Sequence, residues 1–589
     1  MQGIHAPDTD HFPTDTAGLP AALEPETIDV GPGEEVTLAI GPVAKRLGDA
    51  QLRMLAYNGS IPGPTLKVQQ GSEITVHVLN DGDLEATVHW HGLRLENRYD
   101  GTHETQDPME VGEKFTYRIQ FPDPGVYWYH PHIREDYGQE LGLYGNILVT
   151  PADPDYWPPA NREITLTLDD VLIEDGRIAP FSRTDTTYVA MGRFGNTLLV
   201  RGEADLALTA HTGEVVRFYL TNTANTRVFN VGFEGARMKL VGGDSGRVEH
   251  EEFVEAVLLA PSERAVVDVL FEGQGAARLV HTTPDRRYEL ATIDVGETPA
   301  EPSHADAFAV ARTNPDMVAE RERLSAFQAA PADKTIAFIA EMDMGTPEGA
   351  VVYVCPMHPD VVSAEEGSCP KCGMKLLASA VESYACPMHP EVVSESSDAR
   401  CPRCGMKLVP AQFVSATSDS SHAGHEHHEH GHHGHEHEHH HDHAASGGIE
   451  WEDDMVEVNK LTTPANTRWK IVDRSTGAAN HAIDWHFRVG DRVKIRLVNE
   501  MDSDHPMHHP FHIHGAGRFL VLSRDGVEEQ NLVWKDTVLV RTGETVDILL
   551  EVTNPGVWMA HCHIAEHHES GMMFSFHVTD PSGSNGEGR

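Results

Sequence analysis

The sequence predicts an all-β protein built from several β-sandwich domains. Short segments in which apolar and polar residues alternate recur along most of the chain, and turns rich in Gly and Pro separate them. Hydrophobic residues make up 40% of the 589 residues, which is enough apolar material for several cores. At about 150 residues per domain, this length accommodates roughly four domains.

The first predicted domain covers residues 28–155. Residues 73–79 and 114–121 have the alternation of half-buried strands, and the Pro-Gly-Pro sequence at 62–64 is typical of a turn. Residues 1–27, in contrast, are rich in Asp, Thr, Pro and Ala. We expect this N-terminal segment to be disordered.

Two further segments show the same alternation of apolar and polar residues. Residues 156–311 predict a second sandwich, with a strand near 215–221, and residues 451–580 predict a third, with a strand near 545–552. The tail at 581–589 is expected to be disordered.

An insert at 312–421 separates the second and third domains, and it contains two copies of one unit, at 355–376 and 386–408. Each unit offers three thiols and one imidazole. The candidate metal ligands are Cys355, His358, Cys369 and Cys372 in the first unit and Cys386, His389, Cys401 and Cys404 in the second. Three Cys and one His are a zinc ligand set, whereas thiolates with nearby thioethers favour Cu(I). The ligand set leaves zinc and Cu(I) open, with thiol redox chemistry a weaker third reading.

Residues 422–450 form a tract in which His alternates with Glu, Gly and Asp. A tract this polar cannot bury a core, so we expect a disordered, metal-binding linker. An engineered affinity tag is the alternative, which the internal position and the interspersed acids disfavour.

The charge balance restricts the partners. Lys and Arg total 45 against 91 Asp and Glu, so the net charge is −46, which repels nucleic acid and anionic membranes and attracts cations. No apolar run is long enough to span a bilayer, so we expect no membrane insertion. The first basic residue is Lys45, so the sequence predicts a cytoplasmic protein, or a periplasmic or extracellular one whose leader is missing from this chain. Nothing in the sequence indicates the oligomeric state.

Six of the seven cysteines lie between 355 and 404, and the seventh is Cys562. This distribution favours metal binding over a disulfide framework. In an extended His561-Cys562-His563 segment, Cys562 points to one face and the two histidines point to the other. Cys562 with His567, Met572 and one more imidazole would make the ligand set of a blue copper site.

Three other stretches contain paired histidines: His89-Trp90-His91-Gly92, His130-Pro131-His132 and His509-Pro510-Phe511-His512-Ile513-His514. A single His-x-His pair is usually structural, but four pairs with a Cys inside one of them are hard to obtain by chance. In this order, the four motifs resemble those of the multicopper oxidases, the family of laccases and bacterial copper-tolerance oxidases. The two Cys-rich units resemble the small heavy-metal-binding domain often attached to copper-efflux proteins.

The resemblance implies three cupredoxin-like domains, the middle one without copper, and four copper ions. The type 1 copper is then held by His509, Cys562, His567 and Met572, the type 2 copper by His89 and His512, and the type 3 pair by His91, His130, His132, His514, His561 and His563. Cys562, His561 and His563 would also carry electrons from the type 1 copper to the cluster. Dioxygen is the implied acceptor, and Cu(I) or a phenol the implied reductant.

Reduction of dioxygen consumes protons, so we expect acids near the cluster. Asp100 matches the position at which the family keeps an acid beside the type 2 copper. The residue after the last type 1 histidine is often Glu in bacterial relatives but is His568 here, which leaves Glu569 as a candidate substitute. A laccase with a structural zinc insert and a copper-buffering protein with incidental oxidase activity are the alternative functions. We also expect that the stretch 346–447 could be removed without loss of the blue colour.

Overall fold

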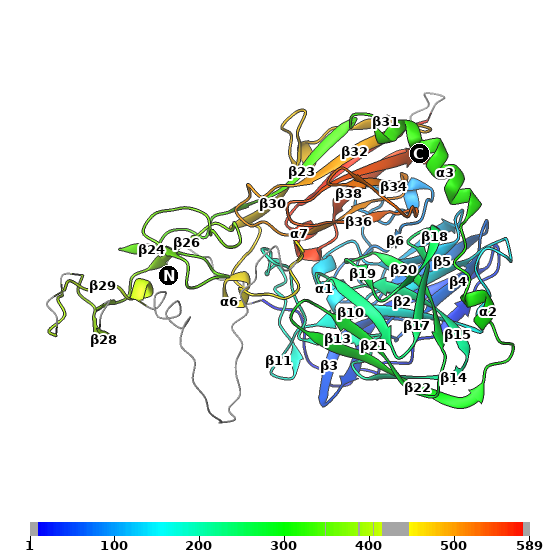
Figure 1. Ribbon diagram of the computed structural model, residues 1–589, viewed down its shortest axis with the longest axis horizontal. Coiled ribbons are helices and arrows are strands. Elements are labelled where there is room, and N and C mark those ends of the chain that lie inside the picture. Colours follow the sequence, from blue (N-terminus) through cyan, green and yellow to red (C-terminus); the bar gives the residue numbers. More distant parts are fainter. Residues whose placement is uncertain are drawn as a thin grey trace.

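The computed structural model describes residues 10–347, 349–386, 389–397, 399–403, 406–414 and 447–580. It consists of three β-sandwich domains packed against one another, with a small two-part extension to one side (Figure 1). The predicted all-β class is confirmed.

The first domain packs a five-stranded sheet on a four-stranded sheet. The first sheet has the order β1 (Thr27–Asp29), β4 (Thr65–Gln69), β9 (Gly145–Thr150), β8 (Gly125–His130) and β6 (His89–His91), and the second has β3 (Ala50–Tyr57), β2 (Glu35–Leu47), β5 (Glu73–Asn80) and β7 (Lys114–Gln120). In β5, the side chains of Ile74, Val76 and Val78 alternate inward and pack the core between the sheets, as the sequence predicted. The short β6 lies at the edge of its sheet, pairing His89 with His130.

Residues 10–27 are not disordered, contrary to the prediction. Phe12 is buried and stacks on Tyr137 with 3.9 Å between ring centroids, and its backbone N–H donates to the Phe181 carbonyl. This aromatic anchor and backbone hydrogen bonds such as that from the Ala22 N–H to the Ala44 carbonyl together hold a segment whose composition alone predicts a free chain. Residues 1–9 and 581–589 lie outside the described part.

The second domain packs a six-stranded sheet on a five-stranded one. The orders are β13 (Thr197–Val200), β10 (Arg162–Val171), β15 (Glu214–Asn222), β20 (Arg264–Phe271), β17 (Arg237–Gly243) and β18 (Gly246–Val254), and β14 (Leu206–Thr212), β22 (Arg287–Pro299), β21 (Gly275–Thr282), β16 (Phe229–Glu234) and β19 (Val257–Leu259). A small ribbon of β11 (Ile173–Glu174) and β12 (Arg177–Ile178) and helix α2 (Ala305–Phe308) complete it.

The third domain again has sheets of six and five strands. They have the orders β30 (Thr467–Asp473), β23 (Lys334–Met342), β32 (Arg492–Asn499), β37 (Thr545–Val552), β34 (Gly517–Arg524) and β35 (Val527–Glu528), and β31 (His486–Arg488), β39 (Met573–Thr579), β38 (Gly556–Cys562), β33 (His509–Ile513) and β36 (Thr537–Val540). The short helices α6 (Val456–Asn459), α7 (Ala565–Glu569) and η2 (Asn480–Ala482) belong to this domain, and α1 (Glu135–Glu140) and η1 (Asn97–Tyr99) belong to the first domain.

The predicted start of the insert at residue 312 is wrong. Strand β23 lies inside the third domain's sheet, parallel to β32 and antiparallel to β30. Helix α3 (Pro315–Gln328) also packs on this domain, with Met317 and Leu324 in one cluster with Trp534. The third domain is thus discontinuous in sequence, because a strand preceding the insert completes a sheet formed after it.

The insert proper forms two three-stranded sheets, β25 (Val362–Ser363), β24 (Val351–Val354) and β26 (Leu377–Ala380), and β28 (His389–Ser394), β27 (Tyr384–Cys386) and β29 (Val409–Pro410). β24 and β26 lie between the domains and the outlying β28 and β29 (Figure 1). The predicted linker at 422–450 falls outside the described residues up to residue 446. Within the described part, no helix is both long and apolar enough to cross a membrane.

Candidate metal centres

Strands β33 and β38 place the residues of two centres on opposite sides of one sheet. They pair antiparallel, with Phe511 opposite Cys562 and His512 opposite His561. As the alternation predicted, the Cys562 thiol faces the imidazoles of His509 and His567, while His561 faces His514.

The Cys562 cluster consists of Cys562, His509, His567 and Met572, all fully buried. The Cys562 Sγ lies 3.5 Å from His509 Nδ1 and 3.7 Å from His567 Nδ1. Met572 is fixed in the same turn, because its backbone N–H donates to the His567 carbonyl. His508 instead accepts from the Glu450 N–H through Nδ1, so His509 is the histidine at the thiol. Burial raises the pKa of the Cys562 thiol.

The Cys562 cluster is covered by a loop of the second domain. The Ala190 carbonyl accepts from His567 Nε2 at 3.4 Å, and Met191 places its sulfur 3.1 Å from His505 Nε2. The Trp469 ring lies between, 4.1 Å from the His567 ring and 5.8 Å from the His505 ring. No sequence motif marked Met191 or His505, since they lie in different domains.

The histidine cluster joins the first and third domains. Its members are His89, His91, His130 and His132 from the first domain and His512, His514, His561 and His563 from the third, all buried. The ligand atoms of His132, His514 and His561 lie within 4.8 Å of one another, as do those of His89, His512 and His514. Neither domain alone could assemble this arrangement.

One nitrogen of most of these rings is held by a hydrogen bond, and the other turns inward. His89, His130 and His512 each donate from Nδ1 to a backbone carbonyl at 2.7–2.8 Å, and within the described structure their buried Nε2 atoms have no hydrogen-bond partner. His91 has the reverse arrangement, with Nε2 bonded and Nδ1 unpartnered. Burial lowers the pKa of each imidazole, so the rings are neutral. A neutral imidazole with one nitrogen held by a hydrogen bond and the other nitrogen free to bind is the arrangement that a metal ion requires.

Asp100 bridges the two halves of the histidine cluster. Its Oδ2 accepts from His514 Nδ1 at 2.9 Å, and its backbone carbonyl accepts from His89 Nδ1. Burial raises the pKa of this carboxyl. Asp100 therefore lies among the histidines, where the sequence predicted an acid.

Asp536 is a second acid at the histidine cluster, and no sequence motif predicted it. Its Oδ1 accepts from His91 Nε2 at 2.9 Å, and both its oxygens bind the guanidinium of Arg264, at 2.7 and 2.5 Å. All three side chains are buried. The set combines three domains, so no local pattern could have indicated it.

Glu135, on α1, is a third acid at the histidine cluster, and no sequence motif predicted it either. Its Oε1 lies 3.3 Å from His132 Nε2, and its Oε2 lies 3.5 Å from His568 Nδ1. Glu569, the predicted acid, instead accepts from the Glu135 backbone N–H at 3.0 Å. Burial and the neighbouring Glu569 raise the pKa of Glu135, and burial and Asp136 raise that of Glu569 to about 8. The carboxyl that contacts the cluster histidine is therefore supplied by the first domain.

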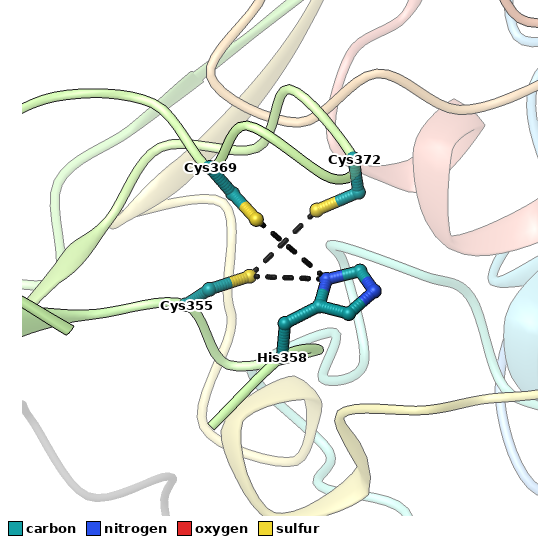
Figure 2. A group of neighbouring side chains, drawn as sticks. All are labelled: Cys355, His358, Cys369 and Cys372. Atoms are coloured by element: carbon teal, nitrogen blue, oxygen red, sulfur yellow. Dashed lines mark hydrogen bonds between the residues drawn. The ribbon is translucent and has the colours of Figure 1, made fainter. Parts of the chain in front are cut away.

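The four predicted ligands of the first repeat converge on one point (Figure 2). The Cys355 Sγ lies 3.7 Å from both Cys372 Sγ and His358 Nδ1, and the Cys369 Sγ lies 3.6 Å from His358 Nδ1. Bond lengths of about 2.3 Å to sulfur and 2.0–2.1 Å to nitrogen give tetrahedral edges of roughly 3.6–3.8 Å. The separations match those edges and are far longer than a disulfide bond. The hydrogen bond between Cys355 and Cys372 lowers the pKa of Cys355 and raises that of Cys372, so one sulfur of the pair favours the thiolate that a metal binds.

The second repeat repeats this geometry. The His389 Nδ1 lies 3.7 Å from Cys386 Sγ and 3.6 Å from Cys401 Sγ. Cys404, the predicted fourth ligand, lies outside the described residues.

A Cys-His-His-Met cluster joined through one tripeptide to eight histidines between two cupredoxin-like domains defines a multinuclear copper oxidase. Two family models described as multicopper oxidase match residues 42–154 and 451–582, and the heavy metal binding domain model matches 352–378 and 383–411. The chain belongs to the multicopper oxidases, as a three-domain member with two heavy-metal-binding repeats between its second and third domains.

Its relatives and structural neighbours agree. The multicopper oxidase MmcO of Mycobacterium tuberculosis is 26% identical over 566 residues, covering 94% of this chain and 90% of the relative. Copper resistance protein A of Pseudomonas syringae pv. tomato is 27% identical over 150 residues, 25% of this chain and 24% of the relative. The fold resembles that of a multicopper oxidase from Campylobacter jejuni, a metallo-oxidase, with a TM-score of 0.58, 19% identity and coverage of 96% of this chain and 98% of that one.

Proposed function

We propose that this oxidase acts on Cu(I) in copper tolerance. Bound at the two centres, copper would take one electron from each of four Cu(I) substrate ions and pass them to dioxygen, which with four protons gives two waters. His509, Cys562, His567 and Met572 are the proposed type 1 ligands. The eight members of the histidine cluster are the proposed ligands of one type 2 and two type 3 coppers.

The residues between the two centres favour this division of roles. Cys562 is covalently joined to His561 and His563, so a thiolate ligand of one centre lies one residue from two imidazoles of the other. His561 also donates from Nδ1 to the Cys562 carbonyl at 2.8 Å, which fixes the ring relative to the thiolate strand. The type 2 pair, His89 and His512, comes from different domains and lies with 5.8 Å between ring centroids.

The cover over the Cys562 cluster is the observation that favours Cu(I) over a phenol. The His567 ring edge, at which an organic reductant would donate its electron, is closed by the Ala190 carbonyl. Beside it, the Met191 thioether and the His505 imidazole form a soft sulfur and nitrogen pair of the kind that suits Cu(I). Met191 and His505 are both buried, so the pair fits a single small cation, whereas an aromatic ring would have to displace the cover.

Oxygen uptake with Cu(I) and with a phenol, on one copper-loaded preparation, tests the proposal. Met191→Leu keeps the volume of the side chain but removes the thioether, so we expect roughly a tenfold rise in KM for Cu(I), about 1.4 kcal/mol, with phenol turnover unchanged. Equal losses with both substrates would contradict a specific Cu(I) site.

The alternatives give different outcomes. A laccase with a structural zinc insert would turn over phenols faster than Cu(I), and a copper-buffering protein would bind copper without steady oxygen consumption. The name of the Pseudomonas relative, a copper resistance protein, favours copper handling for this chain as well. A periplasmic or extracellular site of action, where Cu(I) enters the cell, is part of the proposal, and fractionation of cells that make the full-length protein tests it.

A further inference from the structure

The two heavy-metal-binding repeats have almost the same sequence but different surroundings. The first repeat shares the core of the third domain: Cys355, Cys369 and Cys372 belong to one hydrophobic cluster with Trp469, Cys562 and Met572. The second repeat packs mainly on itself, in a small cluster of Cys386, Cys401 and Leu408. It also lies farther from the domains (Figure 1).

The two repeats differ in the solvent exposure of their equivalent methionines. Met374 and Met406 occupy the same position in the Cys-Gly-Met-Lys sequence, yet Met374 is 1% exposed and Met406 is 38% exposed. The ligand histidines differ in the same sense, since His358 is buried and His389 is half-buried. A metal ion in the first repeat is therefore shielded, and one in the second lies closer to solvent.

The first repeat is attached to one particular segment of the oxidase, residues 501–509, here called the ligand loop because it ends at His509. The backbone N–H of Lys375 donates to the Asp504 carbonyl at 2.8 Å, and Lys375 Nζ lies 3.2 Å from the Asp504 carboxylate. Gly373, in the turn that follows Cys372, has φ +76°, and a Cβ built on it lies 3.5 Å from Met501 and Pro506. The metal-binding turn thus contacts the ligand loop on both sides of Asp504.

Asp504 also connects the first repeat to strand β23 of the third domain. The same carboxylate oxygen that faces Lys375 accepts from the Met342 N–H at 2.8 Å, at the end of β23. Lys375 Nζ also donates to the Met342 carbonyl. The following residue, His505, is the one that faces Met191 over the Cys562 cluster. The position of the first repeat is therefore coupled to both the ligand His509 and the cover.

We propose that the two repeats have separate roles: the first holds a structural metal ion that braces the ligand loop, and the second holds the metal ion that exchanges with the medium. This deepens the proposed function, on which it rests for the identity of the exchanging metal. It also replaces the expectation that residues 346–447 could be removed without loss of the blue colour, because part of that stretch belongs to the third domain's core.

A chelator time course on the full-length, fully loaded protein tests the division, with a cuprous and a zinc chelator together and all released metals counted. We expect one repeat metal to leave at least tenfold faster than the other, and Cys401→Ser to abolish the fast fraction while the thiolate-to-copper band stays in place. Cys369→Ser should keep the fast fraction and shift or weaken that band. Loss of both repeat metals at one rate would overturn the proposal.

If Cys369→Ser does not fold, Lys375→Ala separates docking from metal ligation, and Lys407→Ala at the equivalent exposed position is the matched control. We expect Lys375→Ala alone to speed release of the slow metal and to shift the thiolate-to-copper band. Equal behaviour of the two lysine variants would refute the bracing role. Oxygen uptake of the wild type with Cu(I), measured separately, tests the proposed function itself, so the two ideas can fail independently.

Discussion

Asp536→Asn tests whether an acid from outside the sequence motifs holds the histidine cluster together. The substitution leaves one oxygen, which can still accept from His91, but removes the charge opposite Arg264. Among the described residues, Asp244, at 3.8 Å, is then the remaining buried counter-charge of Arg264. Breaking a buried ion pair costs about 3–5 kcal/mol, and the remaining Asp244 places this case near 3 kcal/mol. Loss of a residue that orients a metal-bound histidine typically lowers metal affinity 10–100-fold.

The assay is copper content per chain after dialysis against graded chelator, with the thiolate-to-copper band as an internal reference. We expect cluster copper to fall while the band persists, because Asp536 contacts no member of the Cys562 cluster. Asp123→Asn is the matched control: Asp123 binds Arg94 at 2.7 and 2.9 Å and Arg518 at 3.0 Å but none of the histidines. If both variants lose cluster copper equally, the effect is general destabilisation and the reasoning about His91 is refuted.

Three further predictions concern separate parts of the molecule. Cys562→Ser should abolish both the blue band and oxidase activity, because serine supplies no soft thiolate, and an unchanged absorption spectrum would overturn the type 1 assignment. Asp100→Asn should keep the blue band but slow reoxidation by dioxygen in stopped-flow measurements, since it alters an acid at the cluster without removing a ligand; normal reoxidation would reduce Asp100 to a structural residue. Leu324→Ala should lower the free energy of unfolding by about 2–5 kcal/mol in denaturant titrations, because Leu324 is buried against Trp534, and a negligible change would argue that α3 is not part of the third domain's core.

Local sequence was sufficient to predict those parts of the site that depend on the alternation of side chains along one strand or on the spacing within one motif. The opposite faces of Cys562 and His561, and the convergence of Cys355 with Cys372, follow from spacing and secondary structure. Asp536 with Arg264, Glu135 with His568, and Met191 with His505 could not be predicted in this way. Each of these pairs joins different domains, and a single chain without its fold carries no signal for such contacts. The same reason explains the misplaced start of the insert, since β23 looks like any other short strand until its partners on both sides are known.

The position of β23 also has a consequence for how this protein is made. Strand β32, its parallel neighbour, begins 150 residues after β23 ends. Its other neighbour, β30, begins 125 residues after β23 ends, so at about 5–20 residues per second of synthesis β23 emerges roughly 6–25 s before the first strand that pairs with it. During that interval Ile336 and Phe338, which end up buried, have no sheet to enter. The two metal-binding repeats are synthesised in the same interval, and a small Cys-rich unit folds as soon as its metal is captured. The order of synthesis therefore allows the first repeat to capture its metal early. The folded repeat can then lie beside β23 until the remaining strands of the third domain are synthesised.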